Sequence, residues 1–398
     1  MSRRPPLQLI FAITLTGILN NTLVTPAIPD ILADLDAPTD RSGILVASGS
    51  LAGIVLAPTI GFLADRFGRR IVLTICLVIF GIFGLGAALA PTFEILLASR
   101  FLQGAGSAGL INLAVVLIGD HWKGTERTKI VGRNSAILTV GLAAVPLLSG
   151  TVTEAFGWRA TFSIYTVAFA TAGWAWLSLD RYRPVEPPSI RRQLAGAGEV
   201  VRTPLVGMTI VSGFFVFVMI FGLMLTVLPV YLAEAFGLEA GARGLVISLP
   251  AITSTLVAFN LGRIRAVVPA RTVVVATSVG FFVAFMTMGL TGALAVVIVG
   301  TLIFGASEGG LIPTLQDLNV AASPDEHRGA VVAIWVGAVR FGQTVGSLLG
   351  GLGIGLLGAS TTLVVGSSIA GLIALIGIFG PFPSTVPRVS AGASPGSE

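Results

Sequence analysis

Charged side chains are scarce in this sequence. Asp, Glu, Lys and Arg together make up 11% of its 398 residues, whereas 54% of the residues are hydrophobic. Apolar windows of about 20 residues, the length that crosses a bilayer core, recur along nearly the whole chain. No stretch of ordinary soluble composition is long enough for a separate globular domain. The composition therefore predicts an all-α integral membrane protein whose function lies within its helices.

Cysteine and histidine are almost missing as well. The single cysteine, Cys76, cannot form a disulfide within the chain, and it says little about the redox compartment. The two histidines, His121 and His327, fall in predicted loops and offer no cluster of metal ligands. No nucleophile triad or phosphate-binding loop is visible. These absences argue against an enzyme, and we expect no metal site and no cofactor.

Twelve apolar segments have the length of a membrane span. They lie at about residues 7–28, 43–64, 70–90, 93–118, 128–152, 158–179, 205–232, 243–262, 271–292, 294–318, 328–356 and 359–381. Polar composition separates them into four regions: a half at 1–180, a cytoplasmic linker at 181–204, a second half at 205–382, and a disordered cytoplasmic tail at 383–398.

An internal repeat relates the two halves. One ungapped shift of 201 residues places Gly104 on Gly305, Gly141 on Gly342 and Gly150 on Gly351, together with their neighbours. We therefore expect two pseudosymmetric six-helix bundles, an architecture that suits alternating access to a site near the membrane midplane. A transporter of small molecules is the leading interpretation.

Positive charge orients the predicted spans. With both termini in the cytoplasm, nearly all lysines and arginines fall on the cytoplasmic side, and only Arg41, Arg159 and Arg243 fall on the outer side. The net charge of +5 therefore reflects membrane topology and not nucleic acid binding. We predict a multi-pass protein of the cell membrane, in contact with the lipid bilayer and monomeric.

The sequence GFLADRFGRR, residues 61–70, packs four charges between two apolar runs. It resembles the signature that the major facilitator superfamily carries between its second and third helices. Helix count, linker position and two-half symmetry agree with this family, so the resemblance covers essentially the whole chain. Within the family, the chain resembles the group of twelve-helix drug:proton antiporters. The signature is specific for the superfamily, but it gives almost no information about the substrate.

This resemblance implies a cytoplasmic gate. Gly61 is expected to let helix two approach a neighbour, and Gly68 to permit the tight turn. Asp65 either caps helix three or faces the start of helix eleven, Ser323-Pro324-Asp325-Glu326. In similar proteins this aspartate holds the cytoplasmic side closed. The implied gating residues are Gly61, Asp65, Arg66, Gly68, Arg69, Arg70 and Asp120, where Arg69 pairs with Asp120 at the end of helix four. The second half departs from this pattern, because Arg263 stands where Asp65 would be.

Two other segments resemble signatures of the same family. RFLQGAG at residues 100–106 matches the helix-four signature, and Arg100, Gln103 and Ser107 share one helical face. That face is expected to line the central cavity, unless Arg100 simply snorkels to the outer surface. In helix five, Gly141, Pro146 and Gly150 match a hinge signature of proton-coupled exporters. Val145 and Ser149 replace two expected glycines, and the resemblance favours antiport over symport.

Charges inside the membrane are candidates for the transport mechanism. Glu308 lies about 14 residues into helix ten and Arg340 about 12 residues into helix eleven, so both fall near the bilayer midplane. We expect them to pair or to share a hydrated pocket, with Glu308 exchanging the coupling proton; a purely structural ion pair is the alternative. Asn20 and Asn21 occupy the middle of helix one and can hydrogen-bond a substrate, whereas Asp30 is expected to be a solvated cap.

The sequence thus predicts a secondary active transporter that works by alternating access. Its function is expected to be proton-coupled export of amphipathic small molecules, as in multidrug efflux. The alternative is an importer or symporter of a small polar metabolite. A membrane enzyme or a sensor is a weaker interpretation, because the twofold repeat favours transport.

Overall fold

The computed structural model describes residues 4–180, 200–324 and 328–385, and within these ranges every regular element is helical. The N-terminal half contains α1 (Leu7–Thr22), η1 (Thr25–Ala27), α2 (Ile28–Asp34), η2 (Thr39–Arg41), α3 (Ser42–Phe67), α4 (Arg69–Ala88), α5 (Phe93–Ser107), α6 (Leu110–His121), α7 (Gly124–Phe156), α8 (Trp158–Ser163), η3 (Ile164–Thr166) and α9 (Val167–Ser178). The predicted linker and tail lie largely outside the described residues.

The C-terminal half repeats this succession of helices. It contains α11 (Pro204–Met219), η4 (Ile220–Val227, a π-helix), α12 (Leu228–Phe236), α13 (Ala240–Ser248), α14 (Pro250–Val267), α15 (Ala270–Leu290), α16 (Leu294–Ala321), α17 (Arg328–Leu357), α18 (Ala359–Gly366) and α19 (Ser368–Phe379). Helices are the expected solution for apolar segments of this length, because a helix satisfies its own backbone hydrogen bonds in lipid.

The number of clear membrane spans is lower than the twelve expected. Among the described residues, ten helices are long and apolar enough to cross a membrane, and a bent pair in the α3 region raises the number to eleven. That pair, Thr39–Ile54 and Thr59–Phe67, meets at an angle of 46°. The predicted span at 158–179 is not among them; it is helical, but the 3-10 turn η3 interrupts it between α8 and α9.

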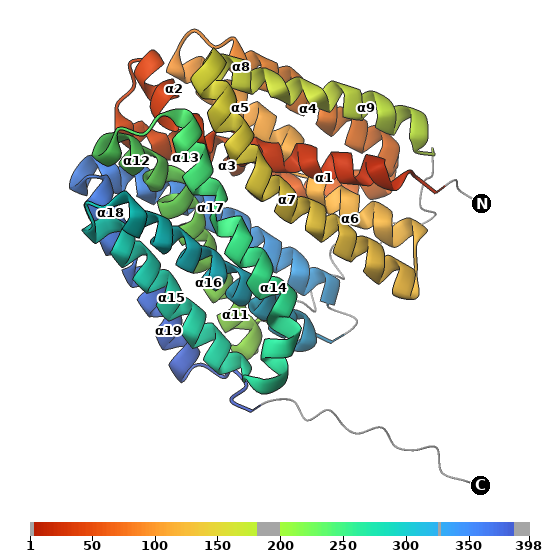
Figure 1. Ribbon diagram of the computed structural model, residues 1–398. Coiled ribbons are helices and arrows are strands. Elements are labelled where there is room, and N and C mark those ends of the chain that lie inside the picture. Colours follow the sequence, from red (N-terminus) through yellow and green to blue (C-terminus); the bar gives the residue numbers. More distant parts are fainter. Residues whose placement is uncertain (1–3, 181–199, 325–327, 386–398) are drawn as a thin grey trace.

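The helices form two groups that follow the chain (Figure 1). Elements α1 to α9, coloured red to yellow, make one group, and α11 to α19, green to blue, make the other. The groups meet along two long helices of the N-terminal half, because α3 packs against α17 and α7 packs against α13 and α14. We call the end of the molecule that carries α2 and the start of α13 the α2 end, and the opposite end the α6 end.

Equivalent glycines make equivalent contacts in the two groups. A Cβ added at Gly104 would clash with the carbonyl oxygen of Gly49, and one added at Gly305 would clash with that of Pro250. Gly49 and Pro250 are themselves related by the same shift as Gly104 and Gly305. Small residues of this kind let helix backbones approach closely in a membrane. The sequence repeat therefore corresponds to a repeated packing contact between helices.

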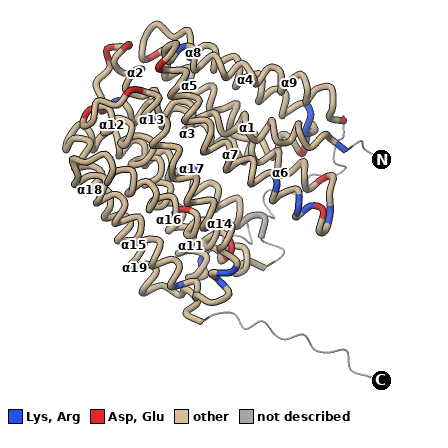
Figure 2. Tube along the Cα trace, in the orientation of Figure 1, with Lys and Arg blue, Asp and Glu red and all other residues tan. Residues whose placement is uncertain are grey.

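Charges concentrate at the two ends of the bundle (Figure 2). Most of the tube between the ends is tan, meaning uncharged, and lysines and arginines gather near the start of α7 and the end of α14. The apolar middle is the part that would lie in a bilayer. The charged residues within that middle are therefore few, and they define the candidate site.

Candidate functional site

Arg100 lies at the centre of a polar cluster inside the N-terminal half. Its side chain is 0% exposed. Its guanidinium donates hydrogen bonds to Gln103 Oε1 at 2.7 Å, the Tyr165 hydroxyl at 3.2 Å, the Asn20 carbonyl oxygen at 2.6 Å and Asn21 Oδ1 at 3.3 Å. Its Nε has no hydrogen-bond partner. The four recorded acceptors are neutral, so no carboxylate compensates this charge through an ion pair among the described residues.

Asn20 and Asn21, two of the predicted site residues, belong to this cluster and also contact α3. Asn20 Nδ2 donates to the carbonyl oxygen of Gly49 at 2.9 Å, and Asn21 Nδ2 donates to the hydroxyl of Ser50 at 3.2 Å. Both asparagines therefore join α1 to α3. Because Arg100 is enclosed, it does not snorkel to a membrane surface. The predicted grouping of these polar residues is present, but Arg100 and Gln103 are buried among helices and do not form an open cavity wall.

Tyr165 is a member of this cluster that the sequence interpretation missed. Its hydroxyl lies 3.3 Å from the carbonyl oxygens of Leu19 and Asn20, and its ring packs edge-on against Phe80. A buried tyrosine hydroxyl normally finds a partner. Tyr165 is one of three tyrosines in the chain and falls in the middle of a predicted span. A rare tyrosine in the middle of a span could therefore have been predicted from the sequence as part of a buried polar cluster.

Arg340 joins the two halves near the middle of α17. Its Nη2 donates to the carbonyl oxygen of Ala108 at 2.9 Å, across the boundary between the groups. Ala108 lies in the short break between α5 and α6. Gly53 of α3 makes room for the guanidinium, because a Cβ there would lie 2.6 Å from Nη1. Arg340 Nε is buried and has no hydrogen-bond partner.

Glu308 and Arg340 are not brought together. No ion pair between them is recorded, although both side chains lie in the described part of the chain. Glu308, in the middle of α16, interacts instead with the hydroxyl of Ser254 on α14. The reason is helical geometry: Gly309, next to Glu308, packs against the Ser254 backbone, so this stretch of α16 faces α14. Arg340 faces α3 and the break after α5.

A charged triad joins the end of α3, the start of α4 and the end of α6. Arg69 forms an ion pair with Asp65, and its Nε donates to Asp120 Oδ2 at 3.2 Å at the end of α6. Gly68 has a φ of +93°, a conformation that favours glycine. Arg69 thus lies between the two acids that the family resemblance suggested. The start of helix eleven at residues 325–327 lies outside the described residues.

One expectation for the segment at residues 61–70 is wrong. Gly61 was expected to allow close approach between helices, but a Cβ added there would meet nothing within 4 Å. The two remaining arginines contact aromatic rings: Arg66 lies 5.6 Å from the ring centre of Phe67, and Arg70 lies 4.1 Å from that of Trp176 on α9. Arg70 therefore ties α4 to α9.

The predicted helix-five hinge lies within α7, which remains helical through Pro146. Gly150 packs against the backbone of Ala240, and Gly244 of α13 packs against the carbonyl oxygen of Pro146. Gly141 packs within its own half, against Leu15 and Ile18 of α1. Pro146 and Gly150 thus provide close packing between the two halves at the α2 end.

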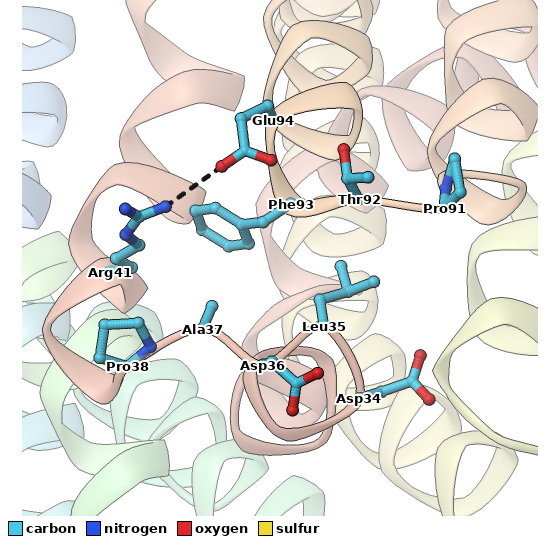
Figure 3. A pocket seen from close by; sticks show the side chains of 10 residues that line it. All are labelled: Asp34, Leu35, Asp36, Ala37, Pro38, Arg41, Pro91, Thr92, Phe93 and Glu94. Carbon is cyan, nitrogen blue, oxygen red and sulfur yellow. Dashed lines mark hydrogen bonds and ion pairs between the residues drawn. The ribbon is translucent and has the colours of Figure 1, made fainter.

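A second arginine joins the halves at the α2 end. Arg243, 3% exposed, forms an ion pair with Asp30 and donates to the carbonyl oxygen of Pro26 at 3.0 Å. Asp30 was expected to be a solvated cap, and this expectation is wrong. The contact joins residues more than 200 positions apart, so no local pattern indicates it. Close by, a surface pocket is lined by residues of the α2–α3 connection and the start of α5, where Arg41 pairs with Glu94 at 3.3 Å (Figure 3).

Comparison with known proteins identifies the family. The family model described as Major Facilitator Superfamily matches residues 10–269 and 232–396. The chain belongs to this superfamily. It is therefore a secondary transporter of the membrane and not an enzyme. Among the described residues, no group of three His, Cys, Asp or Glu side chains is placed to hold a metal ion.

Among the relatives within the Major Facilitator Superfamily, one is named an exporter and another is named for lincomycin resistance. The chain is 35% identical over 158 residues to the lincomycin resistance protein of Streptomyces lincolnensis, a match that covers 40% of this chain and 31% of that protein. It is 33% identical over 126 residues to the bacillibactin exporter of Bacillus subtilis (strain 168), covering 30% and 31%. The matched segment thus spans about a third of the length of these curated relatives.

A solved structure supports the fold over nearly the whole chain. A bacterial homolog of the human lysosomal transporter Spinster, in an inward-facing and occupied conformation, superposes with a TM-score of 0.79. The superposition covers 94% of this chain and 95% of that one at 17% identity. In this superfamily member, Arg100, Glu308 and Arg340 are charged residues in the interior of α5, α16 and α17.

Proposed function

We propose that the protein exports amphipathic small molecules in exchange for protons, by alternating access of a site between its two halves. The observation that carries this proposal is the placement of Glu308. Its carboxyl group lies in the middle of α16, with a hydroxyl as neighbour and no recorded ion pair among the described residues. A carboxyl group at this depth is costly to keep charged, so it readily exchanges a proton when the site opens to water.

The relatives support export as the direction. The bacillibactin exporter is named for export and the lincomycin resistance protein for drug resistance, and both match this chain at 33% identity or more over segments. The glycine and proline contacts of α7 with α13 fit the exporter-type signature of helix five. Glu308 supplies the acid that helix one lacks, since Asn20 and Asn21 cannot carry a proton.

The proposal includes a membrane topology and a gate. Twelve spans result if α8, η3 and α9 cross the membrane together, in two pseudosymmetric bundles at 1–180 and 205–382 with both termini in the cytoplasm. The α6 end is then cytoplasmic, and its basic loops obey the positive-inside rule. The triad of Asp65, Arg69 and Asp120 would act there as half of a gate in a monomeric cell-membrane protein.

The test is transport by reconstituted protein. A growth screen with a compound panel, with and without expression, supplies a substrate for proteoliposomes. With Glu308→Gln, we expect transport driven by a pH gradient to fall at least about tenfold, while exchange of labelled for unlabelled substrate without a gradient persists. Glu234→Gln, at the exposed end of α12, is the matched control and should transport as the unchanged protein does.

Two results would contradict the proposal. If Glu308→Gln transports as well as the unchanged protein under a pH gradient, Glu308 does not carry the coupling proton. Accumulation of the labelled compound inside expressing cells, in place of its loss, indicates that the protein is an importer or symporter.

A further inference from the structure

We propose that the transported molecules are organic anions, and that Arg340 binds their acidic group. This inference rests on the proposed transport of amphipathic molecules and adds the sign of their charge. It comes from the balance of charges between the helices, from the position of Arg340 between the two halves, and from the chemistry of its present partner.

The first observation is an excess of buried positive charge. Arg100 and Arg243 are buried and Arg340 is half-buried, and among the described residues Arg243 alone of these three has a carboxylate partner, Asp30. Glu308 interacts with Ser254 and with neither Arg100 nor Arg340 in any recorded ion pair. An unpaired charge inside a membrane is costly, and it attracts an ion of opposite sign. Cationic compounds would be repelled by the same charge.

The second observation separates Arg340 from Arg100. Arg100 is fully enclosed within the N-terminal half and donates to four oxygen atoms there. Arg340 is partly exposed and lies where α17 meets α3. Superfamily transporters with two repeated halves bind substrate near the midplane between those halves. Of the two arginines, Arg340 therefore has the position that a transported molecule can reach.

The third observation is the unused donor capacity of Arg340. A guanidinium has five N–H donors, yet the structure records one hydrogen bond from Arg340, from Nη2 to Ala108. Its Nε is buried without a partner. A carboxylate accepts two parallel hydrogen bonds from such a group and binds it more strongly than a neutral carbonyl oxygen does. An anionic substrate can therefore replace the Ala108 carbonyl oxygen as the acceptor for Arg340. Binding of the substrate would then break one hydrogen bond between the halves.

The test uses three fluorescent probes that share one apolar body. They are 11-(dansylamino)undecanoate, its primary amide, and the analogue with a trimethylammonium head. Binding to the full-length protein in lipid nanodiscs is followed by dansyl fluorescence at a single pH and without a gradient. The measurement is therefore independent of proton coupling, and a negative Glu308→Gln transport result leaves it interpretable.

We expect the unchanged protein to bind the carboxylate roughly tenfold or more tighter than the amide, the size of one charge-assisted hydrogen bond. In Arg340→Gln this preference should fall to about twofold or less, with amide binding retained as evidence of a folded site. Arg340→Lys should keep part of the preference. Arg263→Gln, which changes an exposed arginine outside the site, should keep all of it.

Three outcomes overturn the assignment. The first is a carboxylate preference that survives in Arg340→Gln. The second is an unchanged protein that binds the amide or the ammonium analogue as tightly as the carboxylate. The third is an unchanged protein that binds none of the three probes, because a site for amphipathic anions has to accept this carboxylate.

Discussion

Two arginines connect the halves of this transporter, one at the α2 end and one in the middle, and their partners differ in kind. Arg243 meets the carboxylate of Asp30, whereas Arg340 meets the main-chain carbonyl of Ala108. The pair at the α2 end is neutralised by the protein itself. In the described part of the chain, no carboxylate forms an ion pair with Arg340, the arginine in the middle. The halves are thus joined by an ion pair at the α2 end and by a hydrogen bond to a main-chain oxygen in the middle.

The largest expected effect comes from Gly351→Val. Gly351 packs against the Asp40 carbonyl oxygen and the Gly43 backbone at the α2 end, and backbone atoms cannot move aside as a side chain can. Overpacking costs about 1–3 kcal/mol, and the upper value applies here because backbone surrounds the added side chain. We expect spin labels at Ala33 and Ala235, one in each half, to move apart. Gly173→Val, where an added Cβ meets nothing within 4 Å, is the control, and an equal separation in both variants would contradict the prediction.

A smaller effect is expected from Arg243→Gln. Removing one partner of a buried ion pair costs about 2–5 kcal/mol, and the lower value applies because the Asp30 side chain is 35% exposed. The same labels should report a shift of roughly 30-fold towards the separated state. Arg340→Gln breaks a hydrogen bond to a neutral carbonyl and should shift this equilibrium only about fivefold. Equal shifts in the two variants would remove the distinction between the α2 end and the middle.

The smallest effect is expected from Gly61→Ala. Open space surrounds Gly61, so the added methyl group should change the free energy of unfolding by less than about 0.5 kcal/mol. Gly49→Ala, in the same helix, should lower the thermal midpoint clearly, since its Cβ would meet the Arg100 guanidinium. Thermal unfolding in detergent compares the two variants. A larger loss for Gly61→Ala would show that this glycine is packed after all.

The sequence predicted best what depends on local pattern or on repetition. The apolar runs became helices, Gly68 forms the turn after α3, and the 201-residue shift recovers the contacts of Gly104 and Gly305. These features need only hydrophobicity, backbone conformation and the equivalence of two halves. The repeat therefore carried information about packing as well as about topology.

Partner choice in the interior was harder to predict. Depth alone suggested that Glu308 and Arg340 would meet, but the faces that α16 and α17 present direct these side chains to different neighbours. Asp30 and Arg243 lie at the ends of helices in opposite halves, and their pairing depends on how the two groups of helices dock. Local spacing gives the face of a single helix, and it does not give the docking of two bundles.

The partner of Arg340 also affects how this contact can be found experimentally. Every amino acid placed at position 108 retains a main-chain oxygen, so an alanine scan or a deep mutational scan leaves the acceptor in place. Covariation between positions 108 and 340 has no side-chain pair to detect. Replacing the amide after Ala108 by an ester makes this oxygen a poorer hydrogen-bond acceptor. This backbone substitution tests the contact directly, which side-chain substitutions at position 108 cannot do.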